Sequence, residues 1–178
     1  MCIIKLVDKK YVTNESVYNV CRYVLDCLKT TEDLYRGIGK QDNFSNMSYI
    51  GPQWVPEACA NGIAEEIMLQ NHLYHNIDST QVYHRVIAFE YDDLVNGNDL
   101  KSLMDYIMTT IYSDYTWTYG IHMDTKNIHV HILVSAISRH WRRFNISYEV
   151  ERLYSICCNW YEKHCDYIMR TGKLERYI

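Results

Sequence analysis

The sequence predicts a single α/β domain of the α+β kind, with a central, mainly antiparallel sheet and helices packed against it. Two observations lead to this fold class. The expected elements follow the order β-α-loop-α-β-α-β-β-α, and only a short turn separates the last two strands, so they form a hairpin. The 178 residues, 48% hydrophobic with 7 Gly and 2 Pro, suit one compact domain. We expect it to span residues 1–178, either as the whole protein or as the N-terminal part of a longer one.

The first half of the chain predicts a strand, two helices and a loop. Residues 1–7 read as a strand, and a helix follows because apolar residues recur at helical spacing: Val17, Cys21, Val24 and Leu28. Residues 30–53 are rich in Gly and Asn and predict a long irregular loop. Pro56 predicts the start of a second helix, which ends near Leu69.

The second half predicts three strands and two helices. Residues 82–91 are rich in β-branched and aromatic side chains and predict a strand. A helix over residues 99–112 precedes two strands, 115–122 and 128–137. The last helix follows Ser147, with an apolar stripe of Val150, Leu153, Cys157 and Trp160.

Composition limits the function classes. The formal net charge is −4, from 18 Lys+Arg and 22 Asp+Glu, so any binding to nucleic acid must depend on a local patch or on a metal ion. The chain has no run of about 18 apolar residues, so we expect no membrane span. Its N-terminus lacks a basic start followed by a long apolar run, so we expect no signal peptide. The 7 Cys show no CxxC spacing and predict free thiols in a reducing cytoplasm.

Three histidines gather in the predicted hairpin. Strand alternation places His129 and His131 on the same face. Residues 124–127 predict a four-residue turn, which places His122 opposite His129. Three imidazoles on one rigid hairpin can bind one metal ion and leave coordination positions open, although polar residues on a solvent-facing strand alternate in the same way. His84 lacks this geometry, and we expect it to be a satisfied core or edge histidine.

The segment around these histidines resembles a motif of a known enzyme family. Residues 122–131, H-M-D-T-K-N-I-H-V-H, are similar to the third motif of the relaxases of conjugative and mobilisable plasmids, in the HUH endonuclease superfamily. Residues 82–89, VYHRVIAF, are similar to the preceding tyrosine-histidine strand, and residues 19–26, NVCRYVLD, resemble the helix that carries the nucleophilic tyrosine. The likeness spans about residues 15–165 and is greatest to the mobilisation-protein relaxases. One departure is Ala88, where family members often carry a serine near the scissile phosphate.

The resemblance implies an activity and its partners. A relaxase nicks single-stranded DNA at a transfer origin: a tyrosine hydroxyl attacks the phosphorus and leaves a 5′-phosphotyrosine and a free 3′-OH. A divalent ion, Mn²⁺ or Mg²⁺, held by the three histidines would polarise the phosphate. The implied partners are single-stranded DNA, an accessory DNA-binding protein and a coupling protein.

The remaining site residues are assigned from their positions. Tyr23 is the expected nucleophile, because it matches the family helix and lies off the apolar stripe; Tyr18 and Tyr49 are the alternatives. Asp124 would orient an imidazole or help to activate the nucleophile, or else stabilise the turn. A basic turn supplies candidate phosphate contacts, unless it is an ordinary solvated turn: Arg139, Arg142 and Arg143.

Three other functions fit parts of this pattern. A rolling-circle replication initiator uses the same HUH chemistry, and its gene neighbourhood would distinguish it from a relaxase. A three-histidine hydrolase of a small molecule needs a closed pocket and no nucleophilic tyrosine, and it would not bind single-stranded DNA. A catalytically inactive DNA-binding relative is disfavoured by the presence of all three histidines.

Overall fold

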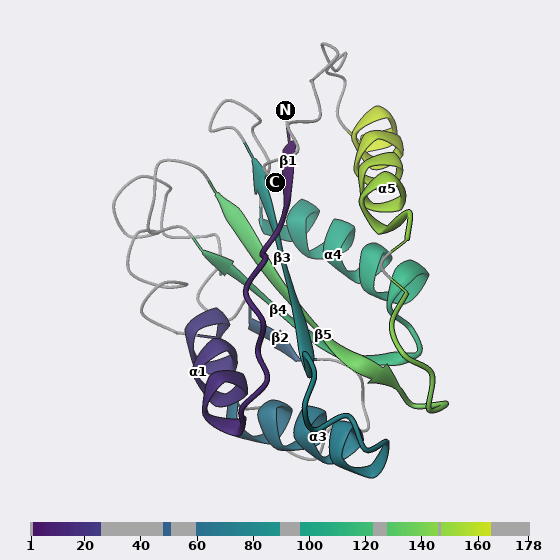
Figure 1. Cartoon of the computed structure of the whole chain (residues 1–178). Helices are drawn as coiled ribbons and strands as arrows, with labels where there is room; N and C mark the ends of the chain where they lie inside the picture. The colour runs from purple at the N-terminus through teal and green to yellow at the C-terminus, as the bar shows by residue number, and fades with distance from the viewer. Residues whose placement is uncertain are drawn as a thin grey trace.

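A five-stranded sheet with helices on both faces forms the protein (Figure 1). The computed structural model of the chain describes residues 2–25, 48–50, 60–89, 97–122, 128–145 and 147–164. The strands are β1 (Cys2–Leu6), β2 (Ser48–Ile50), β3 (Val82–Phe89), β4 (Tyr115–His122) and β5 (His129–Ser138). The helices are α1 (Asn14–Val24), α3 (Ala60–Leu73), α4 (Gly97–Ile111) and α5 (Glu149–His164).

The sheet order is β1-β3-β5-β4-β2, and every pair of neighbouring strands is antiparallel. The predicted fold class is therefore confirmed. The strands β4 and β5 form the expected hairpin, and helices follow the predicted periodic segments. None of the helices in the described parts of the chain is long and apolar enough to cross a membrane.

Two predicted boundaries differ from the structure. The expected loop over residues 30–53 is wrong at Ser48–Ile50, which form an edge strand paired with β4. Three residues are too short for a periodic signal, and pairing with an existing strand edge decides their conformation. The rest of that loop and Pro56 lie outside the described residues. Helix α3 continues to Leu73, beyond the predicted end near Leu69.

One face of the sheet carries the larger hydrophobic core. Helices α4 and α5 pack there on the apolar side chains of the strands, which include Ile87, Ile121, Val130, Ile132 and Val134. A buried ion pair joins β3 to the start of α5, because the guanidinium of Arg85 donates to both carboxylate oxygens of Glu149 at 2.8–3.0 Å. The hydroxyl of Tyr112 donates to the same carboxylate at 2.6 Å. This network satisfies a charge that would otherwise be costly to bury.

The opposite face carries a smaller core under α1 and α3. The capping box of Thr13 and Ser16 starts α1. The buried stripe of α1 then packs on α3 and on two strand residues, Val82 and Leu133; its members are Val17, Val20, Cys21 and Val24. This packing fixes the position of α1 over the sheet.

Arg85→Met should lower the free energy of unfolding by about 3–5 kcal/mol, because it leaves the Glu149 carboxylate buried without its cationic partner. Urea denaturation of the purified protein measures this loss. Arg152→Met is the matched control, since this arginine of α5 is exposed and donates to the carbonyl of Thr110 at 3.3 Å. The control should change stability by about 0.5 kcal/mol or less. Equal losses in the two variants would contradict the role given to the buried pair.

Candidate functional site

The hairpin brings three histidines together on the face that carries α1 and α3. In the register of β4 and β5, His122 lies opposite His129, as the sequence predicted. Gly120 then lies opposite His131. The ring centroids of the three imidazoles lie 4.4–5.5 Å apart. One ring nitrogen from each histidine lies within 4.8 Å of the other two. Two imidazole nitrogens on one metal ion are at most about 4.2 Å apart, so small ring rotations would let all three bind one ion.

The ring of His122 is oriented by the end of helix α1. Its Nε2–H donates to the carbonyl oxygen of Val24 at 3.0 Å, and the side chain is buried. The carbonyls of the last helical turn have no partner within the helix, so this contact also caps α1. With Nε2 carrying the proton, Nδ1 holds the lone pair that could bind a metal ion.

A fourth histidine, His84, contacts the ring of His131. Its Nε2 lies 2.8 Å from Nδ1 of His131, and its Nδ1 lies 3.0 Å from the hydroxyl oxygen of Tyr11. Burial, together with the charge of Arg85, lowers the pKa of His84 to about 4, so the ring is neutral near pH 7. The expectation of a satisfied, buried histidine is confirmed. Its contact with His131 was missed, because only the pairing of β3 with β5 reveals it.

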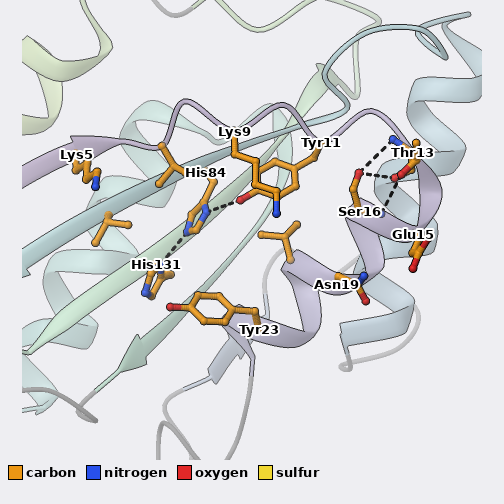
Figure 2. A pocket seen from close by; sticks show the side chains of 13 residues that line it. Lys5, Lys9, Tyr11, Thr13, Glu15, Ser16, Asn19, Tyr23, His84 and His131 are labelled. Atoms are coloured by element: carbon orange, nitrogen blue, oxygen red, sulfur yellow. Dashed lines mark hydrogen bonds between the residues drawn. The ribbon is translucent and has the colours of Figure 1, made fainter. Parts of the chain in front are cut away.

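Tyr23 lies against the histidine cluster. Its ring centroid is 5.3 Å from that of His122 and 5.1 Å from that of His131, and 41% of the residue is exposed. Figure 2 shows the ring of Tyr23 next to His131. The alternative Tyr18 points elsewhere, because its hydroxyl donates to Glu65 on α3 at 3.3 Å. Tyr49 lies on β2, where only the backbone is described.

A groove leads away from Tyr23 and His131 between α1 and the N-terminal segment. Its volume is about 690 Å³. Figure 2 shows Lys5 and Lys9 on the N-terminal segment and Asn19 on α1 along its walls. The groove therefore joins the histidine cluster to a surface that carries two cationic side chains.

The three arginines of the predicted basic turn are not brought to this cluster, and Asp124 lies outside the described residues. The basic turn follows the far end of β5, roughly 30 Å along the strand from His129 at about 3.3 Å per residue. Two of its side chains bind nearby protein groups, since Arg139 donates to the carbonyl of Ser113 and Arg143 donates to Asn76 at 2.8 Å. The structure thus separates this turn from the histidines.

An antiparallel sheet whose central hairpin holds a histidine cluster is the arrangement expected of a relaxase nuclease domain. The family model described as "Relaxase: MobA/VirD2-like, nuclease domain" matches residues 54–165, more than half of the chain. The chain therefore belongs to this relaxase family, within the HUH superfamily. No curated protein gives a significant match to the chain. The matched region includes the three histidines and His84 but begins after Tyr23.

Gly120→Ala should disturb the junction of α1 and β4. A Cβ atom at this position would lie 1.9 Å from the carbonyl oxygen of Val24, so helix or strand backbone must shift. We expect the free energy of unfolding to fall by about 1–3 kcal/mol, as in other overpacked sites. Urea denaturation measures the change. A variant as stable as the wild type would contradict the close approach of α1 to the hairpin.

Proposed function

We propose that this protein nicks single-stranded DNA at a transfer origin by transesterification, with Tyr23 as the nucleophile. The observation that carries the proposal is the position of the Tyr23 ring against His122 and His131. Membership of the relaxase family supports the same reaction class. A rolling-circle replication initiator would use the same chemistry, and the matched family model favours the relaxase. An exposed tyrosine beside the histidines disfavours a hydrolase that encloses a small molecule.

The chemical step conserves the number of phosphodiester bonds. The Tyr23 hydroxyl oxygen forms a bond to the phosphorus, and the bond between phosphorus and the 3′ oxygen breaks. The phenol loses its proton and the leaving 3′ oxygen gains one, so a 5′-phosphotyrosine and a free 3′-OH result. The conserved bond energy allows a 3′-OH to attack the phosphotyrosine and rejoin the strand. Helix α1 contributes by holding the nucleophile beside the histidines before the DNA binds.

The three histidines fit the divalent metal ion that such a reaction uses. His122, His129 and His131 would hold it, and the fit rests on their convergent nitrogens. A bound divalent ion supplies positive charge that polarises the scissile phosphate. Val24 and His84 leave Nδ1 of His122 and Nε2 of His131 as the nitrogens suited to binding. Because imidazole is a softer ligand than oxygen, these residues favour Mn²⁺ over Mg²⁺.

The DNA strand needs local cationic surface on an acidic protein. Lys5 and Lys9 line the groove that starts at Tyr23, and they supply positive charge close to the reaction. The basic turn with Arg139, Arg142 and Arg143 is too distant to contact the scissile phosphate. Its binding to phosphates farther along the strand stays a prediction.

Tyr23→Phe should abolish the covalent protein–DNA adduct while single-stranded DNA binding persists. The substitution removes only the hydroxyl oxygen that attacks phosphorus. The test incubates the protein with Mn²⁺ and single-stranded oligonucleotides from the transfer origin of the host element, and a denaturing gel detects the adduct. Tyr18→Phe is the matched control on the same helix and should form the adduct normally. An adduct formed by Tyr23→Phe but not by Tyr18→Phe would assign the reaction to Tyr18, and a wild type that forms none would refute the nickase.

His129→Ala should weaken Mn²⁺ binding about 100-fold or more. Losing a residue that only hydrogen-bonds to a metal ligand already weakens binding about 10- to 100-fold, and His129 is proposed to be a ligand itself. Isothermal titration calorimetry measures the affinity, with Mg²⁺ titrated in parallel and expected to bind more weakly. His72→Ala, at an exposed position in the last turn of α3, is the control and should bind Mn²⁺ like the wild type. Identical affinities for His129→Ala and the wild type would exclude His129 as a ligand.

A further inference from the structure

A buried chain of three polar side chains ends at the histidine cluster. It runs from the Tyr11 hydroxyl to His84 and on to His131, over contacts of 3.0 Å and 2.8 Å (Figure 2). All three residues are at most 6% exposed. Neither Tyr11 nor His84 forms or breaks a bond in the reaction proposed above, yet both occupy a region where polar groups are costly to bury.

His84 is not itself placed to bind the metal ion. Both of its ring nitrogens are engaged, Nδ1 with Tyr11 and Nε2 with His131. The residue whose orientation depends on His84 is therefore His131, which belongs to the group of three convergent histidines.

We propose that Tyr11 and His84 are positioning residues, which hold His131 in the tautomer and orientation that bind the metal ion through Nε2. The inference rests on the proposed metal site. Tautomers follow from the hydrogen-bond network. If Nε2 of His131 keeps its lone pair, Nδ1 carries the proton and donates to Nε2 of His84. The Nδ1–H of His84 then donates to the hydroxyl oxygen of Tyr11.

If both hydrogen bonds ran in the opposite direction, His131 could not bind a metal ion through Nε2. In that direction the Tyr11 hydroxyl donates to Nδ1 of His84, and Nε2–H of His84 donates to Nδ1 of His131. His131 would then carry its proton on Nε2, where the ion must bind. Metal binding and the direction of these two hydrogen bonds are thus linked, as they are for histidine ligands that donate to a carboxylate or carbonyl.

The backbone keeps Tyr11 at the outer end of this chain. Its carbonyl accepts from the amide of Gln81 at 2.9 Å, and Tyr11 pairs with Val82 at the start of β3. The side chain of Gln81 donates to the carbonyl of Val12 at 2.6 Å. The ammonium of Lys9 lies 5.4 Å from the centre of the Tyr11 ring, on the groove side. Tyr11 is therefore held in place by backbone contacts of its own, in addition to the contact of its hydroxyl with His84.

The experiment compares metal binding in His84→Leu, His84→Gln and Tyr11→Phe with that of the wild type. Leu fills a similar volume without an acceptor, and Mn²⁺ affinity should fall about 10- to 100-fold. Gln keeps an acceptor for the Nδ1–H of His131, so its affinity should lie between those of the wild type and His84→Leu. Tyr11→Phe removes one hydrogen bond and should weaken binding about 2- to 10-fold. Tyr18→Phe, which loses the hydroxyl contact with Glu65 on α3, is the matched control.

Two further readouts separate positioning from a structural role. The visible spectrum of bound Co²⁺ should change in His84→Leu and Tyr11→Phe but not in Tyr18→Phe, because it reports the ligand geometry. The second readout is the free energy of unfolding of the metal-free protein. If the variants are less stable than the wild type but keep its Co²⁺ spectrum and Mn²⁺ affinity, the role of Tyr11 and His84 is structural and the proposal is overturned. If His84→Leu does not fold, Tyr11→Phe decides alone by the same criteria.

His131→Ala, measured in parallel, distinguishes the two proposals. If His131→Ala loses Mn²⁺ binding while His84→Leu and Tyr11→Phe bind like the control, the metal site stands and the positioning pair is refuted. If the wild type and His131→Ala bind Mn²⁺ equally, the metal site itself is refuted, and the positioning proposal falls with it.

Discussion

Helix α1 ends against strand β4, where the last helical residue, Val24, accepts a hydrogen bond from the His122 ring at 3.0 Å. The approach is possible because Gly120 has no side chain at the crossing point, where a Cβ atom would meet the same carbonyl oxygen. One contact thus caps the helix, places the proton of the His122 ring on Nε2 and places Tyr23, one residue earlier, beside the imidazoles. The geometry proposed for nucleophile and metal ion depends on it.

The two faces of the sheet divide structural and chemical roles. On the face of α4 and α5, apolar side chains and the Arg85–Glu149 pair form the larger core. On the other face, a smaller core under α1 and α3 leaves the histidine cluster next to a groove. Polar residues are buried beside that groove, but each ring nitrogen of His84 has a partner within 3.0 Å. Such satisfied networks restrict side-chain orientation, which a metal-binding site requires.

Local patterns predicted much of this arrangement. Strand alternation and the short turn were enough to place His122 opposite His129, because register in a hairpin depends on residues close in sequence. Helical spacing likewise separated Tyr23 from the buried stripe of α1. The same reasoning assigned a loop to Ser48–Ile50, whose strand exists only through its pairing with β4. It also treated His84 in isolation, since the neighbouring strand β5 lies far along the chain.

By itself, then, the sequence determined the strands and helices with strong periodicity, the shared face of the hairpin histidines and the resemblance to a relaxase. Only the tertiary structure showed that Tyr23 meets those histidines, because Val24 and His122 are 98 positions apart and no local pattern encodes their contact. It also decided that Arg139 and its neighbours lie at the far end of β5, away from the cluster. Periodicity specifies which face a residue occupies, whereas packing between distant segments specifies what that face meets.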